Sequence, residues 1–183
     1  FAINNGIMVS THQSGGISII NLSSSSILSY DSSDGMDSDF LNDVAIHQDI
    51  AFIGSEDSGI IRYDISNDTF LSSWVSTGVN GVDYAPIAVV GDILYLGLSG
   101  YGVARKDLAT GEILTPLTTR GNVLPSSNIY ALESDGSDLY IGTQGGAVRW
   151  DGNQADNFVN GGQWSTRPNQ FFDFVIDGGD LYA

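Results

Sequence analysis

The sequence predicts an all-β fold of the β-propeller class, and two observations lead to this prediction. A unit of about 43 residues occurs four times, and its clearest marker is an alanine inside an apolar run. The four marker residues are evenly spaced: Ala2, Ala45, Ala88 and Ala131. Short apolar runs bounded by Gly, Asp, Asn and Ser repeat with them, which indicates β-strands rather than helices. A repeat of this length made of short strands is typical of one four-stranded propeller blade.

Further markers repeat with nearly the same period. A glycine opens the expected third strand of each blade, at Gly16, Gly59, Gly102 and Gly146. An Asn or Asp follows five residues later, at Asn21, Asp64, Asp107 and Asp151. An aromatic residue or Met lies near the end of each second strand, at Met8, Phe52, Tyr95, Tyr140 and Tyr182. The Asn/Asp position is expected to form a turn, because its side chain can accept hydrogen bonds from the backbone ahead of it.

Four strands are expected in order within one repeat. In the second repeat they are the runs at 45–46, 50–53, 60–63 and 69–71. Small residues in the first strand suit the tight space where the blades of a propeller converge. A glycine at the end of the second strand, such as Gly97, indicates close approach of another part of the backbone.

The predicted blades span approximately residues 1–43, 44–86, 87–129 and 130–173, and residues 174–183 begin a fifth blade. The chain starts inside a first strand and stops in a second strand, so it reads as a single β-propeller domain or fragment of a longer protein. Four blades is the low end of the range for propellers. We therefore expect a homodimer in which two half-rings close into about eight blades. A lone four-bladed ring is the alternative.

Composition limits the classes of partner. The chain has 22 Asp and Glu residues against six Lys and Arg, which gives a net charge of −16. This charge argues against nucleic acid and anionic membrane surfaces, because both require basic residues. The sequence has no cysteine, so disulfides, thiol chemistry and zinc–thiolate sites are excluded. No apolar run reaches the roughly 18 residues that span a bilayer, and we expect no membrane insertion.

Residues 124–151 contain a Pro-Ser-Ser-Asn lead, an Asp-Gly turn, an Ile-Gly-Thr strand end, a Gly-Gly loop and an Arg-Trp-Asp close. This segment resembles the repeat of the two-component-regulator propeller family. The copies at 91–108 and 48–65 are looser, and the copy at 5–22 lacks the Arg and the closing Asp. Residues 60–67 also resemble LVIVD-type surface propellers. The resemblance implies a sensing ectodomain of a bacterial regulator or a secreted or surface protein, in an extracellular, periplasmic or cell-surface location.

Basic and aromatic residues are candidates for ligand binding. Arg62, Arg105 and Arg149 share one repeat position, so they could face a common ligand or form ion pairs between blades. The repetition favours the structural interpretation, because ligand sites usually break symmetry. Tyr101 and Trp164 lie at or near expected loops, where an aromatic ring can stack on a sugar or hold a peptide.

The densest acidic stretch lies between the first two predicted blades. Its carboxylates are Asp31, Asp34, Asp37 and Asp39. Oxygen ligands around a turn that contains glycine are what calcium requires, which makes calcium a candidate cofactor. The spacing does not follow the EF-hand pattern, and the position eleven after Asp31 is Asn42 rather than Glu. An acidic solvated loop is the alternative interpretation.

The sequence favours a non-catalytic propeller that binds or senses a ligand, which could be a small molecule, a glycan or a protein. The two histidines, His12 and His47, lie in different repeats and neither has a nucleophile-elbow sequence beside it. One alternative is a structural or adhesive segment of a secreted or cell-surface protein. Another is an enzyme of the lyase or glycosidase kind, since 22 acidic residues provide many possible carboxylate pairs.

Overall fold

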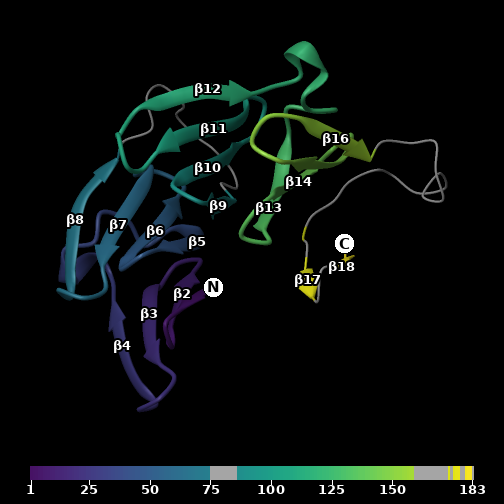
Figure 1. Ribbon diagram of the computed structural model, residues 1–183. Helices are drawn as coiled ribbons and strands as arrows, with labels where there is room; N and C mark the ends of the chain where they lie inside the picture. The colour runs from purple at the N-terminus through teal and green to yellow at the C-terminus, as the bar shows by residue number, and fades with distance from the viewer. Residues whose placement is uncertain (75–85, 159–172, 174, 178–179, 183) are drawn as a thin grey trace. The chain divides into compact units, whose positions relative to one another are not determined.

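The structure is a computed structural model that describes residues 1–74, 86–158, 173, 175–177 and 180–182. Its described strands form four four-stranded antiparallel sheets and one two-stranded sheet, and in each sheet the strands lie in chain order (Figure 1). The fold is therefore all-β and of the β-propeller class, as the repeat predicts. The chain divides into two compact units, Phe1–Ala85 and Pro86–Ala183. The predicted single domain and the predicted blade boundaries stay predictions.

Unit 1 contains two sheets, which we call blades 1 and 2. Blade 1 consists of β1 (Ala2–Asn4), β2 (Ile7–His12), β3 (Gly16–Asn21) and β4 (Ser26–Tyr30). Blade 2 consists of β5 (Leu41–His47), β6 (Ile50–Ser55), β7 (Ile60–Asp64) and β8 (Thr69–Trp74). A 3₁₀ turn, η1 (Ser32–Asp34), lies in the connection between them.

Unit 2 contains blades 3 and 4 and a short hairpin. Blade 3 consists of β9 (Ile87–Val90), β10 (Ile93–Leu98), β11 (Gly102–Asp107) and β12 (Ile113–Leu117). Blade 4 consists of β13 (Ile129–Ser134), β14 (Leu139–Thr143), β15 (Gly146–Trp150) and β16 (Ala155–Phe158). A second 3₁₀ turn, η2 (Arg120–Asn122), connects them, and the hairpin consists of β17 (Val175–Asp177) and β18 (Asp180–Tyr182).

Each unit has its own apolar core between its two blades, built from the β-branched and Leu side chains that alternate along the strands. In unit 1 the core side chains include Val9, Ile17, Ile19, Val44, Ile53 and Ile61. In unit 2 they include Tyr95, Val103, Ile129, Leu139, Ile141 and Val148. Tyr30 and Tyr63 also link the blades of unit 1, because both hydroxyls donate to one carboxylate oxygen of Asp68.

Tight hairpins set the register of the inner strands. In blade 1 the connection between β1 and β2 is Asn5-Gly6, and both residues have positive φ, 48° and 77°. This conformation fits the strand twist of a two-residue hairpin. The corresponding turns of blades 2 and 3 have positive φ at Gln48 and Gly91. In blade 4 four residues, 135–138, separate the strands.

The register corrects one of the sequence markers. Ala45 pairs with Phe52 and Ala88 pairs with Tyr95, seven residues apart in both blades. In blade 1 Ala2 pairs with Val9, although Met8 was the expected equivalent. Met8 is six residues from Ala2, and neighbouring strand residues point to opposite faces. Met8 therefore lies on the other face of the sheet from Ala2.

Two glycines occupy places where a side chain would collide with a neighbouring strand. A Cβ on Gly16 would lie 1.9 Å from the carbonyl oxygen of Tyr30, and one on Gly102 would lie 2.2 Å from that of Leu117. Both also have positive φ, 75° and 89°. Gly97 confirms the expected close approach at the end of the second strand, because its Cβ would meet the Ile129 side chain at 2.7 Å.

The predicted turn after the third strand is confirmed in all four blades. The side-chain oxygen of the marker residue accepts hydrogen bonds from the backbone N–H groups two and three residues ahead. The four marker residues are Asn21, Asp64, Asp107 and Asp151. For Asp107 these bonds are 2.9 Å from Ala109 and 2.8 Å from Thr110.

Candidate functional site

The first of the three repeated arginines, Arg62, binds a backbone carbonyl rather than a carboxylate. Its Nε and Nη2 donate to the carbonyl oxygen of Ser72 at 3.0 and 2.7 Å. Its guanidinium carbon lies 4.4 Å from the ring centroid of Trp74, a cation–π distance. All three residues belong to blade 2. The structure thus places Arg62 in a local contact that fastens β7 to β8.

Arg105 repeats this arrangement in blade 3. Its Nε donates to the carbonyl oxygen of Thr115 at 2.7 Å. Its guanidinium carbon lies 5.5 Å from the ring centroid of Trp150, which belongs to blade 4. Arg105 therefore contacts the neighbouring blade of unit 2 through an aromatic ring. The structural interpretation of the sequence expected an ion pair between blades instead.

The carbonyl that each of these arginines binds lies at a β-bulge. The register of β7 and β8 shifts between Ile60 and Arg62, and that of β11 and β12 shifts between Val103 and Arg105. A bulge disrupts the ladder locally, so a carbonyl at this place needs another donor. In blade 1 the same repeat position is Ile19, and β3 pairs with β4 without a shift.

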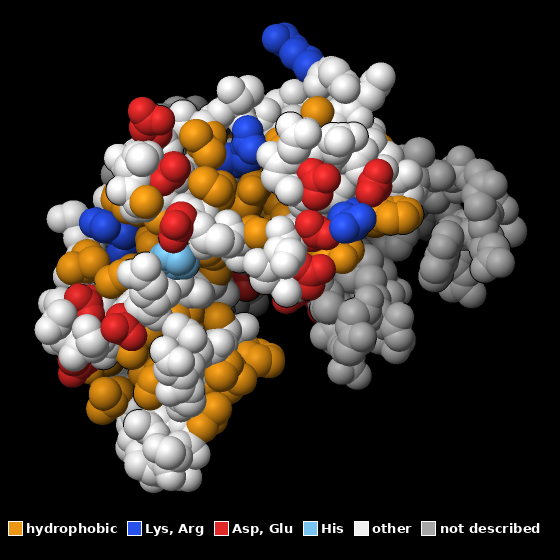
Figure 2. Space-filling view, viewed as in Figure 1, with side chains coloured by type: hydrophobic (Ala, Val, Ile, Leu, Met, Phe, Trp, Pro, Cys, Tyr) orange, Lys and Arg blue, Asp and Glu red, His pale blue; other side chains and the backbone are white. Residues whose placement is uncertain are grey.

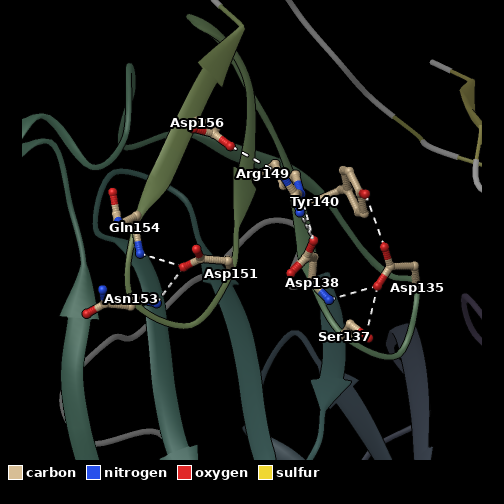
Figure 3. A network of polar contacts seen from close by, with 9 residues as sticks. All are labelled: Asp135, Ser137, Asp138, Tyr140, Arg149, Asp151, Asn153, Gln154 and Asp156. Carbon is tan, nitrogen blue, oxygen red and sulfur yellow. Dashed lines mark hydrogen bonds and ion pairs between the residues drawn. The ribbon is translucent and has the colours of Figure 1, made fainter.

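Arg149 departs from the pattern and forms a polar network on blade 4 (Figure 3). Its Nε and Nη2 both lie 2.6 Å from the Asp138 carboxylate, and its Nη1 lies 3.4 Å from that of Asp156. Asp156 is the direct cross-strand neighbour of Arg149, and Asp138 lies in the turn between β13 and β14. These contacts stay within one blade.

The turn of blade 4 holds this network in place. Asp135 accepts the backbone N–H groups of Ser137 and Asp138 at 2.8 and 2.7 Å, and the hydroxyl of Tyr140 at 3.1 Å. The bonds from the backbone lower the pKa of Asp135. Burial raises the pKa of Tyr140, and the hydrogen bond with Asp138 raises that of Arg149. At neutral pH the network therefore contains a charged Arg149, an ionised Asp135 and a neutral Tyr140.

A second group of candidate residues lies on loops of unit 2. We call the segments 99–101, 118–128 and 144–145 the unit-2 loop surface. Backbone bonds join them: the N–H of Gly102 donates to the carbonyl of Ser127, and that of Gln144 donates to the carbonyl of Asn128, both at 3.1 Å. The Asn128 side-chain amide donates to the Gln144 side chain at 2.8 Å. The connection that leads from blade 3 to blade 4 is thus fastened to both of their glycine loops.

The composition of the unit-2 loop surface differs from that of the whole chain. Its segments contain no Asp or Glu, and Arg120 is their one charged residue. Tyr101 is 60% exposed, and the side chain of Gln144 is also exposed. An exposed aromatic ring can stack on a ligand, and neutral amides can donate and accept hydrogen bonds.

The carboxylates of the acidic stretch accept hydrogen bonds from their own loop and from β8 of the same unit. Asp31 accepts from the N–H of Ser33 at 2.7 Å and caps η1, and hydrogen bonds from Ser33 lower its pKa. Asp39 accepts from the N–H of Ser32 at 2.7 Å. Asp37 accepts from the hydroxyl of a serine on β8. Across the described ranges no three His, Cys, Asp or Glu side chains form a group that could hold a metal ion. Calcium binding by this stretch stays a prediction.

The predicted ligand residues lie on different elements. Tyr101 directly precedes β11, which contains Arg105, whereas Arg149 lies on β15 and Arg62 on β7 of unit 1. Trp164 lies outside the described residues. Sequence reasoning missed the Asn128–Gln144 amide pair, because only the folded connection brings these residues together. It also missed Asp138 and Asp156 as partners of Arg149, although the wider spacing of the blade 4 turn was visible.

The histidines do not form a shared site in the contacts described. The His12 ring nitrogen Nε2 and the Ser18 hydroxyl lie within 2.9 Å on blade 1. His47 ends β5 of blade 2. The described part of the chain also contains no helix that is long and apolar enough to cross a membrane.

Comparisons with known proteins match the fold. The chain aligns over 98% of its length with the extracellular domain of the putative one component system BT4673 from B. thetaiotaomicron, at 19% identity and TM-score 0.72. It aligns over 98% with the extracellular domain of the putative hybrid two component system BT3049 from the same organism, at 18% identity and TM-score 0.62. These matches cover 25% and 27% of those chains, so the present chain spans about a quarter of their length.

A designed protein has the same fold. The computationally designed Ika8 protein aligns with 98% of the chain and 53% of its own length, at 16% identity and TM-score 0.66. No protein-family model matches the chain, and neither does any curated protein. At these identities the likeness to solved structures establishes the β-propeller fold alone.

Proposed function

We propose that this chain is part of a non-catalytic β-propeller that binds or senses a ligand in an extracellular, periplasmic or cell-surface setting. The supporting observation is the match of almost the whole chain to extracellular domains of putative one and two component systems. The sequence resemblance of residues 124–151 to a regulator propeller repeat supports the same class. The ligand site is proposed from the chemistry of the described loops.

The unit-2 loop surface is the part of the described chain best suited to a neutral polar ligand. Tyr101 offers a largely exposed ring, and the Asn128 and Gln144 amides offer donors and acceptors. These segments contain no carboxylate, so an uncharged ligand would not have to desolvate an ionised group there and no cation is required. A glycan fits this chemistry, because a sugar ring has an apolar face for stacking and hydroxyls for the amides.

The contacts support the ligand-binding class over the enzyme class. Arg149, Tyr140 and three carboxylates do lie together on blade 4. However, a general acid of a glycosidase needs a raised pKa. Hydrogen bonds from the backbone N–H groups of Asp138 and Ser137 lower the pKa of Asp135, which is the opposite direction. Asp138 and Asp156 both form ion pairs with Arg149. These carboxylates are therefore engaged in contacts within blade 4.

The binding experiment uses residues 1–183 and a panel of neutral oligosaccharides and uncharged peptides, with calorimetry as the readout. We expect saturable binding of an oligosaccharide that Tyr101→Ala weakens at least about tenfold, because a lost stacking contact of roughly 1.5 kcal/mol corresponds to that factor. Phe40→Ala is the matched control, since Phe40 is 51% exposed and lies outside the unit-2 loop surface. Absence of binding, or equal binding by Tyr101→Ala, would contradict the proposed site.

The adhesive alternative predicts a different result. A structural segment of a surface protein would bind no small oligosaccharide or peptide and would associate only with other proteins. The calorimetric panel therefore separates this class from a sensing propeller. The homodimer of two half-rings stays a prediction, and the molecular mass of the chain in solution tests it.

A further inference from the structure

Each four-stranded blade ends in an outer strand, and these four strands differ in how they are protected. The outer strands are β4, β8, β12 and β16 (Figure 1). An outer strand presents backbone N–H and C=O groups that another strand could pair with. Soluble proteins normally block such edges with bulges, prolines, charged side chains or very short strands.

Three of the outer strands carry such features. β8 and β12 are both bulged against their inner neighbours, and β12 also contains Pro116. β16 is four residues long and carries Asp156. These features interrupt a regular ladder or place a charge at its edge, so they disfavour the addition of another strand.

β4 has none of these features. Its five residues, Ser-Ile-Leu-Ser-Tyr, pair with β3 in an unbroken register from Ile17–Tyr30 to Asn21–Ser26. It contains no charged residue and no proline. Ile27 is 62% exposed and Leu28 is 49% exposed, although both are large apolar side chains. β4 is therefore a regular, neutral and partly apolar edge.

The charge distribution also singles out this part of the molecule. Residues 1–30 contain no Asp, Glu, Lys or Arg, so all 22 acidic and six basic side chains lie in residues 31–183. The bottom of the view in Figure 2, where blade 1 lies, accordingly shows apolar and neutral polar surface. Two copies with a charge of −16 each repel one another over most of their surfaces. Approach through blade 1 brings the neutral parts together.

We propose that β4 pairs with β4 of a second copy, antiparallel across a two-fold axis. Such an interface is self-complementary, since the same strand supplies both sides. Backbone hydrogen bonds join the two edges, and Ile27 and Leu28 become covered by the partner strand. This geometry differs from the closure of two half-rings. It also does not depend on the proposed ligand, and its test does not involve that ligand.

The test measures mass by light scattering over a dilution series of residues 1–183. We expect the mass to rise with concentration from 19.4 kDa to twice that value. Ile27→Lys places a charge at the edge and should keep the chain monomeric throughout. Ile113→Lys is the matched control, because Ile113 is 70% exposed on β12, which is already bulged. Both variants change the net charge equally, and circular dichroism checks that both remain folded.

Hydrogen exchange identifies the strand that forms the interface. We expect the β4 amides to gain protection as the wild-type chain dimerises, with no such gain in Ile27→Lys. A wild-type chain that stays monomeric at all concentrations would overturn the proposal. So would a dimer that survives Ile27→Lys, or one that Ile113→Lys disrupts equally. A monomer whose β4 amides become protected only on adding an extended peptide would show that the edge accepts a different partner.

Discussion

At the scale of single residues, one side-chain oxygen organises the turn after the third strand of every blade. Asn21 and Asp107 each accept hydrogen bonds from the backbone N–H groups two and three residues ahead. The position therefore requires a hydrogen-bond acceptor rather than a charge. Backbone hydrogen bonds lower the pKa values of Asp107 and Asp151, principally those from the N–H groups of Thr110 and Gln154. The pKa of Asp64 is lowered chiefly by hydrogen bonds from the side chains of Asn67 and Ser66. These three turns therefore contribute to the pH dependence of stability.

The triple variant Asp64→Asn, Asp107→Asn, Asp151→Asn tests whether these turns contribute to the pH dependence of stability. A carboxyl group with a depressed pKa in the folded state stabilises the fold above its unfolded pKa of about 3.9, and this stabilisation disappears as pH falls through the folded value. Asn keeps the acceptor but does not titrate. We expect little change in Tm at pH 7 and a smaller acid-induced loss of Tm below about pH 4, measured by calorimetry in high salt.

The corresponding triple Ala variant is the control for the turns. It removes the acceptors, so we expect its Tm to be several degrees lower than that of the wild-type chain already at neutral pH. If the Asn variant lost as much Tm on acidification as the wild-type chain, the three carboxylates would not be responsible for the acid limb.

At the scale of elements, the outer two strands of blades 2 and 3 share a contact between an arginine and a β-bulge, which the sequence repeat does not reveal by itself. Arg62 and Arg105 each bind a carbonyl at the bulge of the adjacent strand. Blade 4 has no bulge between β15 and β16, and there Arg149 turns to carboxylates. The arginine at this repeat position therefore binds a backbone carbonyl where the outer strand is bulged and binds carboxylates where the outer strand is regular.

Replacement of Arg62 by Met tests the bulge contact. Met keeps an apolar stem beside Trp74 but loses the two bonds to the Ser72 carbonyl and the cation–π contact. We expect Tm to fall by about 2–4 °C, the shift that roughly 1 kcal/mol produces in a domain of this length. Arg62→Lys should recover only part of this loss, because an ammonium group lacks the planar fork. Equal Tm values for wild type and Arg62→Met would show that the bulge needs no side-chain donor.

At the scale of the whole molecule, the sequence predicts the fold far better than the contacts. Period and strand length define the blades, because each repeat must supply the same four strands in the same order. The sequence misplaces Met8 by one residue: Ala2 pairs with Val9 at the same seven-residue spacing as the pairs of blades 2 and 3, so Val9 is the equivalent position. A shift of one residue moves a side chain to the opposite face of the sheet. It does not reveal the bulges, or that Asp138 pairs with Arg149, because the turn that carries Asp138 has this length only in blade 4 among the described blades.

The net charge of −16 makes ionic strength a determinant of stability for the whole chain. Like charges repel more in the compact state than in the unfolded chain, so screening should stabilise the fold. We expect Tm to rise with NaCl most steeply at low salt and to level off once the Debye length falls to about 8–10 Å. Calorimetry over a series of NaCl concentrations at neutral pH measures this dependence.

Calcium separates general screening from binding at the acidic loop. Asp31, Asp37 and Asp39 already accept hydrogen bonds from serines of unit 1, and a bound cation would have to compete for these oxygens. At matched ionic strength we therefore expect CaCl₂ and MgCl₂ to give equal Tm values. A rise specific to calcium that Asp37→Asn abolishes would instead establish the predicted calcium site, since calcium accepts irregular sets of oxygen ligands that magnesium does not. A Tm that does not depend on NaCl would show that the carboxylates repel one another as strongly in the unfolded chain as in the fold.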